Sequence, residues 1–322
     1  MEILVFGAGS LGSLVGGLLA RSHDVTLVGR DPHVSAIRDG GLAVTGAVEA
    51  HTRPDATTDG TGLAAELALV TVKAYDTAAA ADALATGEYG AVCPLGNGLT
   101  GGTLASRLAG RNDAGEDDAG GNDAGEDDDG GDPPTVLSGT ATYGARLCEP
   151  GRVECTGEGT IAIGAREGGA DPWADRAGEA LAAAGIDVVV ATDMPRRRWE
   201  KLAINAGINA PTALARVRNG ELVAGPAREL SREAARETAR VAGAEGVPLS
   251  EPAATDAVEA VADATAPNHS SMRQDVEAGS RTEVDAINGE ICDRAARHGI
   301  EVPVNRTLAG LVRAWEAERD LR

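Results

Sequence analysis

The fold is decided by residues 2–12, which read Glu-Ile-Leu-Val-Phe-Gly-Ala-Gly-Ser-Leu-Gly. The apolar run 2–6 predicts a buried strand, and the apolar periodicity of residues 11–19 predicts a helix. A GxGxxG pattern lies between them: Gly7 permits a tight turn, Gly9 lets a pyrophosphate approach the backbone, and Gly12 lets helix and strand pack closely. The helix N-terminus favours phosphate. We therefore predict a dinucleotide site formed by Gly7, Ala8, Gly9, Ser10, Leu11 and Gly12.

The end of the second predicted strand, 24–28, indicates which dinucleotide binds. There the chain reads Val28-Gly29-Arg30, so a glycine and an arginine stand where an NAD-binding acidic residue often lies. A guanidinium suits a ribose 2′-phosphate. We expect NADPH, with NADH as the less favoured cofactor. The alternative is that Arg30 only pairs with Asp31 at the start of the next helix.

Alternating strands and helices predict an α/β fold with a Rossmann-like, doubly wound parallel sheet. Later strands follow one another closely, which indicates an antiparallel addition. A helix over 173–184 and a strand over 187–191 complete this part. The remaining strands are expected at 67–72, 91–95, 136–143, 152–155 and 160–164.

The second half predicts an all-helical domain, because Ala, Leu, Glu and Arg dominate and strand-like alternation disappears. We place the NADP-binding domain at 1–192 and the helical substrate domain at 193–322. Pro211 is expected to end or bend the first helix. The expected helices are 195–206, 227–246, 251–265, 281–298 and 303–319.

An acidic insertion over 111–134 differs from the rest of the chain, because the ten residues 112–121 recur almost unchanged at 122–131. Without an aliphatic side chain larger than alanine, it is expected to be a disordered surface loop. The more specific alternative is a calcium site, but the acidic residues of this segment lack the spacing of an EF-hand loop.

The net charge of -21 and the pI near 4.6 argue against a nucleic-acid partner. Abundant acid with few aromatics suggests a halophilic cytoplasm, where salt screens the surface charge. An acidic partner-binding face is the alternative. No run approaches the roughly 18 apolar residues of a membrane span, and the chain opens directly into an apolar strand, so we expect a cytoplasmic protein with no membrane partner. Four scattered cysteines predict reduced thiols.

Lys73 and Lys201 are the two lysines among 29 basic side chains. Such a composition keeps lysine where chemistry needs a donor that can release its proton, which arginine cannot do. Lys201, Asn205 and Asn209 recur at four-residue spacing and could face one cleft. Codon bias is the alternative for the lysines, and a polar seam between domains is the alternative for the asparagines.

Two later hydroxyls, Ser270 and Thr282, taken alone would pass as helix N-caps, with Asp285 in a capping box. The segment from Asn268 to Asp275 is expected to open a helix.

The chain resembles the 2-dehydropantoate 2-reductase (ketopantoate reductase) family over nearly its full length. The resemblance is carried by Gly7–Gly12, Val70-Thr71-Val72-Lys73-Ala74, Asn97-Gly98, Trp199-Glu200-Lys201-Leu202 with Asn205 and Asn209, and Ser270-Ser271-Met272 through Gln274-Asp275 to Thr282-Glu283.

The resemblance implies NADPH-dependent reduction of ketopantoate to (R)-pantoate, on the way to pantothenate and coenzyme A, in an active site between a Rossmann domain and a helical domain. It implies Lys201 as the general acid and Glu283 as its orienting or proton-sharing partner. The implied substrate contacts are Asn97, Asn205, Asn209 and Ser271. Lys73 is implied to lie near the nicotinamide ribose, with Asn97 and Glu283 also at the cofactor.

No metal is required by this chemistry, and the sequence shows no His, Asp and Glu cluster that would bind one. A monomer and a homodimer through the helical domain both stay open. Two other functions also remain: a reductase of another branched 2-oxo acid, and a non-catalytic NADP-sensing protein.

Overall fold

The computed structural model describes residues 1–110 and 133–322, which form two compact units. The first unit comprises Met1–Gly96 and Thr100–Met194, and the second comprises Asn97–Leu99 and Pro195–Arg322. The short segment 97–99 thus belongs with the helices, although its position in the sequence lies among the strands. Of the acidic insertion expected over 111–134, residues 111–132 lie outside the described residues.

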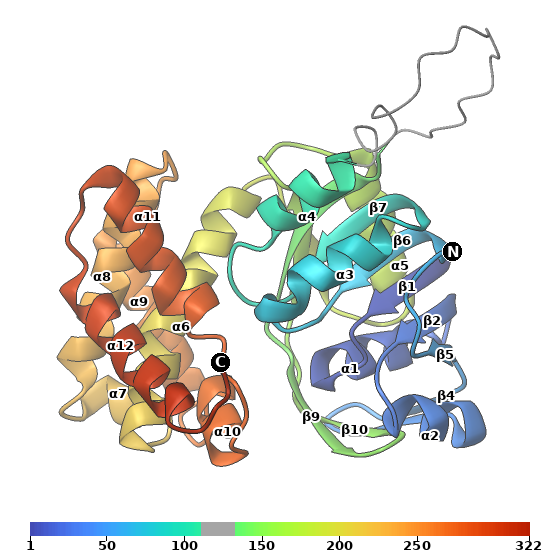
Figure 1. Cartoon of the computed structure of the whole chain (residues 1–322), viewed down its shortest axis with the longest axis horizontal. Coiled ribbons are helices and arrows are strands. Elements are labelled where there is room, and N and C mark those ends of the chain that lie inside the picture. The colour runs from blue at the N-terminus through green and yellow to red at the C-terminus, as the bar shows by residue number, and fades with distance from the viewer. Residues whose placement is uncertain (111–132) are drawn as a thin grey trace, which may run out of the picture. The chain divides into compact units, whose positions relative to one another are not determined.

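The first unit is built on an eight-stranded sheet in the order β12-β11-β8-β7-β6-β1-β2-β5. Figure 1 labels β7, β6, β1, β2 and β5 of this sheet. Neighbouring strands are parallel except for β8 and β11, which run antiparallel. This confirms the α/β class, the parallel sheet and an antiparallel addition. The strands are β1 Glu2–Phe6, β2 Asp24–Val28, β5 Asp55–Thr57, β6 Ala64–Val70, β7 Glu88–Pro94, β8 Thr135–Ala141, β11 Ile161–Ala165 and β12 Val188–Val190.

Helices cover both faces of this sheet because alternate residues of β1 point to opposite sides. Ile3 and Val5 join a core cluster with Leu14 of α1, whereas Leu4 joins a separate cluster with Leu84 of α3. The sheet is therefore doubly wound. The helices of this unit are α1 Ser10–Leu19, α2 His33–Gly40, α3 Thr77–Leu84, α4 Gly101–Ala109 and α5 Pro172–Ala183, with the 3-10 turn η1 at Ala74–Asp76.

A second sheet of four strands, in the order β4-β3-β10-β9, was not predicted. The strand expected at 152–155 does form, but it pairs in parallel with β3 and antiparallel with β9. It therefore does not extend the main sheet, because strand pairing depends on partners distant in sequence. The strands of this sheet are β3 Leu42–Gly46, β4 Ala50–Thr52, β9 Gly144–Glu149 and β10 Arg152–Gly157.

The second unit is helical, as predicted (Figure 1). Its core is formed mainly by small and aliphatic side chains such as Leu202, Ala206, Ala235 and Ile291. Its helices are α6 Met194–Ala215, α7 Glu221–Ala224, α8 Arg228–Ala244, α9 Glu251–Ala264, α10 Ser271–Glu277, the π-helix η3 Asp285–Gly289, α11 Glu290–His298 and α12 Pro303–Ala317.

Two boundary predictions in this unit are wrong. The helix expected over 195–206 runs from Met194 to Ala215, so Pro211 does not end it. The hydroxyl of Thr212, directly after Pro211, donates to the carbonyls of Ile208 and Asn209. The helix expected over 281–298 begins only at Asp285, as a π-helix. Thr282 and Asp285 therefore do not cap a helix starting at 281; both bind residues of the C-terminal segment.

Candidate active site

The glycine-rich turn has the geometry that its spacing predicted. Gly7 follows β1 with φ +116°, and a Cβ there would lie 2.7 Å from the backbone nitrogen of Val72. The hydroxyl of Thr71 donates to the Gly7 carbonyl at 2.8 Å and so holds the turn against the end of β6. A side chain at Gly12 would collide with the Gly7 carbonyl, so this glycine permits the close contact of α1 with the turn.

Gly9 differs from these two glycines, because a Cβ there would meet nothing within 4 Å. It precedes α1 in an extended conformation, and no side chain in the described residues caps that helix. The space beside Gly9 therefore lies at the N-terminus of α1, the positive end of the helix dipole, where a phosphate is favoured. The Ser10 hydroxyl instead accepts a hydrogen bond from Leu147 of β9, at 3.1 Å.

Arg30 lies beyond the end of β2, with 87% of its side chain exposed. Its guanidinium pairs with Asp76 at 3.0 Å, and not with Asp31, which binds the backbone and hydroxyl of Ser35. The expected alternative pairing with Asp31 is therefore wrong. No local pattern points to Asp76 as this partner, because 46 residues separate it from Arg30.

The chain forms a turn directly after β6, which is closed by a hydrogen bond from the Asp76 amide to the Lys73 carbonyl at 2.8 Å. β6, β1 and β2 are neighbours in the sheet. Their carboxyl ends therefore bring together Lys73, the glycine-rich turn and Arg30, at the edge where parallel α/β sheets bind ligands.

In the second unit, Asn97 joins two of the other predicted site residues. Its amide donates to the Glu283 carboxylate at 2.8 Å, and its own oxygen accepts from the Asn205 amide at 3.2 Å. These residues lie up to 186 positions apart in the chain. Glu283 is buried, with 6% of its surface exposed.

Lys201 lies one helical turn before Asn205 on α6 and is half-buried. Burial lowers the pKa of Lys201 to about 8, and the nearby Glu283 carboxylate acts in the opposite direction. An ammonium with this pKa can donate a proton near neutral pH and become neutral without a large cost. Such a shifted pKa is typical of functional sites.

Asn209 and Ser271 lie near a contact between α6 and α10. Asn209 is buried on α6, and Ser271 is exposed at the first position of α10. The hydroxyls of Thr212 and Ser270 meet at 2.7 Å and join the two helices beside them. The Ser270 hydroxyl also accepts from the Arg273 amide, so the predicted N-cap is confirmed. Within residues 1–110 and 133–322, neither Asn209 nor Ser271 forms a hydrogen bond with the cluster of Asn97, Asn205 and Glu283.

Comparison with known proteins identifies the chain. The family model described as ketopantoate reductase PanE/ApbA matches residues 3–168, and the model of its C-terminal part matches residues 193–316. The chain belongs to the ketopantoate reductase family. A relative in Halobacterium salinarum named 2-dehydropantoate 2-reductase is 43% identical and covers 99% of this chain and 100% of its own.

Solved structures agree with this family membership. A ketopantoate reductase from Ralstonia eutropha is 30% identical, with a TM-score of 0.84 over 99% of this chain and 100% of its own. A D-mandelate dehydrogenase solved with NADH and anilino(oxo)acetate also has a TM-score of 0.84, over all of both chains, at 21% identity. The latter similarity concerns the fold alone.

Among residues 1–110 and 133–322, no helix has the length and apolar character needed to cross a membrane. The same residues contain no group of three or more His, Cys, Asp and Glu side chains arranged to hold a metal ion.

Proposed function

We propose that this protein catalyses the NADPH-dependent reduction of 2-dehydropantoate to (R)-pantoate, a step toward pantothenate and coenzyme A. The observation that carries the proposal is the cluster of Lys201, Glu283, Asn97 and Asn205 in the second unit. The names of the relatives support the same substrate.

NADPH, when bound, supplies a hydride to the C2 ketone of the substrate. Negative charge then develops on the ketone oxygen, and the Lys201 ammonium stabilises and protonates it. Glu283 keeps Lys201 charged, since its carboxylate favours the ammonium form. Asn97, Asn205, Asn209 and Ser271 offer uncharged donors and acceptors for the carboxylate and hydroxyl groups of the substrate.

For the cofactor, we propose that the turn 7–12 binds the pyrophosphate, Arg30 the 2′-phosphate and Lys73 the nicotinamide ribose. The space beside Gly9, the first-turn amides of α1 and the exposed guanidinium of Arg30 fit these groups. We propose that Asn97 and Glu283 contact the nicotinamide as well as the substrate.

A substrate panel tests the function. NADPH oxidation is followed spectrophotometrically with ketopantoate and with 2-oxoisovalerate, which lacks the 4-hydroxyl group. We expect a clear preference for ketopantoate. Equal rates would favour a reductase of another branched 2-oxo acid. Failure to oxidise NADPH with any 2-oxo acid would favour a nucleotide-sensing protein.

The reaction should lose rate at alkaline pH, because Lys201 must be protonated to act as an acid. With a pKa of about 8 for this ammonium, kcat/KM for ketopantoate should be level below that pH and fall above it. This decline is the alkaline limb of the pH profile. It should approach about tenfold per pH unit, because one required proton is lost. Pantoate oxidation should rise over the same range. In a Lys201→Arg control, any residual activity should lack this limb, since arginine stays protonated.

Cofactor preference should depend on Arg30 and Asp76. Arg30→Ala should raise KM for NADPH by about tenfold or more and leave KM for NADH nearly unchanged, since one charged hydrogen-bond partner of the 2′-phosphate is lost. Asp76→Asn should lower KM for NADPH, because the carboxylate that lies 3.0 Å from the guanidinium in the wild type competes with the phosphate. KM for both cofactors is measured in each variant.

Asp82→Asn is the matched control for Asp76→Asn, because Asp82 also pairs with an arginine of the first unit, Arg107. This substitution should leave the ratio of the two KM values unchanged. An Arg30→Ala enzyme that retains the wild-type ratio would contradict the proposed 2′-phosphate site.

A further inference from the structure

We infer that Glu316 on α12 is a positioning residue that holds the Glu283 carboxylate beside Lys201. This inference rests on the proposed function, because it assigns Glu316 a part in the same reaction. Glu316 itself is not proposed to touch the substrate.

Glu316 is completely buried and binds the residue directly before Glu283. Its Oε1 accepts hydrogen bonds from the Thr282 amide at 2.7 Å and from the Thr282 hydroxyl at 2.6 Å. The same hydroxyl accepts from the Val284 amide at 3.2 Å. The backbone on both sides of Glu283 is therefore tied, through Thr282, to one carboxylate that lies more than thirty positions later in the chain.

The second oxygen of Glu316 binds the last residue of the chain. Arg322 donates from Nη1 to Glu316 at 2.8 Å and from Nη2 to Asp285 at 2.9 Å. Arg313 of α12 donates from Nε to the other Asp285 oxygen at 2.8 Å. Side chains from the C-terminal part of the chain thus hold the turn around Glu283 on both sides.

A buried carboxylate is costly to keep, because removal from water is only partly offset by its ion pair and hydrogen bonds. A neutral side chain could fill the same space at the end of α12. What the Glu316 carboxylate adds is charged hydrogen bonds to the Thr282 backbone and hydroxyl, which are stronger and more restrictive than neutral ones. We therefore connect its charge with the need to hold the Glu283 turn in one position.

The π-helix that follows the turn supports this interpretation. A π-helix is rare and occurs frequently at functional sites. It begins at Asp285, which the two arginines hold, and a Cβ at its last residue, Gly289, would lie 2.6 Å from Nη2 of Arg313. Gly98 packs on the same element, with its Cβ position 2.8 Å from the Ala286 carbonyl. The segment that carries Asn97 and the turn that carries Glu283 are therefore held together at this element.

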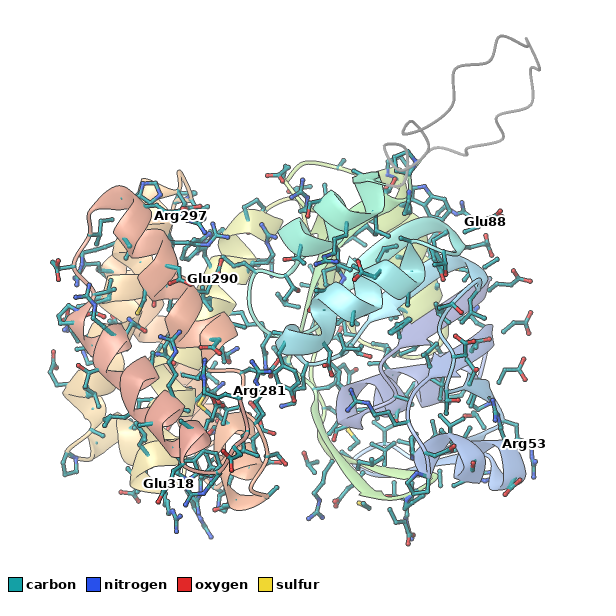
Figure 2. All side chains as sticks on the ribbon, viewed as in Figure 1. Arg53, Glu88, Arg281, Glu290, Arg297 and Glu318 are labelled. Atoms are coloured by element: carbon teal, nitrogen blue, oxygen red, sulfur yellow. The ribbon has the colours of Figure 1, made fainter. Side chains whose placement is uncertain are left out.

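The side chains involved come from four separate parts of the second unit: α6, the segment 97–99, the turn before η3, and the C-terminal part of the chain. Figure 2 shows the side chains of this unit and labels Arg281, the residue directly before Thr282, and Glu318, just beyond the end of α12.

The test compares Glu316→Ala, Glu316→Gln and Leu308→Ala in the full chain. Leu308 is a buried residue of the same helix that lies two turns earlier, so its truncation destabilises α12 without removing a bond to Thr282. For each variant, kcat, KM for NADPH, the pH dependence of kcat/KM and the thermal midpoint are measured.

We expect Glu316→Ala to lower kcat by about tenfold or more, in the range of a lost catalytic positioning effect. KM for NADPH should change less, because the proposed phosphate and ribose contacts belong to the first unit. Its alkaline limb should also move to lower pH, because a displaced Glu283 no longer favours the Lys201 ammonium. Glu316→Gln should have a kcat between those of Glu316→Ala and the wild type, since its amide oxygen can still accept from Thr282 but only in neutral hydrogen bonds. Leu308→Ala should lower the thermal midpoint and leave the alkaline limb in place.

The inference is overturned if Glu316→Ala keeps the wild-type limb and loses activity only in proportion to its folded fraction. Should that variant not fold, Thr282→Val provides the same readout, since it removes the hydroxyl bonds and keeps the backbone bond; an unchanged limb there has the same meaning. The variants are compared only after the wild-type protein has been shown to reduce ketopantoate. A wild-type protein without this activity would contradict the proposed function and not the role of Glu316.

Discussion

Replacing Lys201 with alanine is expected to lower kcat for ketopantoate reduction by about 10²–10⁴-fold, the usual contribution of a positioned general acid. The methyl group can neither stabilise the charge on the ketone oxygen nor protonate it. Folding and NADPH binding should persist, because the proposed cofactor residues other than Asn97 and Glu283 belong to the first unit. Turnover is measured by NADPH absorbance, and cofactor binding by fluorescence titration.

Two variants sharpen this test. Lys201→Arg keeps the positive charge, so a partial recovery relative to alanine would separate charge stabilisation from proton donation. Glu283→Gln keeps the side-chain size and the acceptor for Asn97 but removes the charge that acts on Lys201. Turnover of Lys201→Ala close to wild type would end the assignment of the general acid.

Gly9→Val should abolish most NADPH binding and leave the fold intact. The backbone of Gly9 has φ -86°, outside the left-handed region that favours glycine, and its Cβ position is free of contacts. The added side chain would occupy the space through which a pyrophosphate approaches the first turn of α1. We expect a rise of about a hundredfold or more in the dissociation constant, since phosphate contacts with the helix terminus would be lost. The thermal midpoint without cofactor should stay close to wild type.

Gly102→Val is the matched control, because Gly102 also lies in the first unit with nothing within 4 Å of its Cβ position. Any general cost of adding valine appears in that variant, whose NADPH affinity should be normal. If Gly9→Val bound NADPH as tightly as the control does, the glycine-rich turn would not be the phosphate site.

Local signals predicted much of the first unit correctly. Residues 2–19 contain their own strand, turn and helix because apolar periodicity and three glycines act over a few positions. The strand at 24–28 and the helical character of the second half follow from the same kind of pattern. The resemblance to the ketopantoate reductase family was confirmed over nearly the whole chain.

Errors arose where a distant partner decides the structure. Asp285 has the spacing of a capping box, yet it binds Arg313 and Arg322, and the expected helix starts four residues late. The strand at 152–155 looked suited to the main sheet, but β3 and β9 pair with it. Side-chain partners so far apart in sequence leave no local periodic signal.

The sequence by itself determined the dinucleotide-type turn, the change from strands to helices, the family, and the rare lysines that mark candidate chemistry. Only the tertiary structure decided that Asn97 binds Glu283 and Asn205, that Asp76 pairs with Arg30, and that Glu316 holds Thr282. The physical reason is range: turns and helices depend on neighbours a few residues away, whereas these contacts join segments that only the packed core brings together.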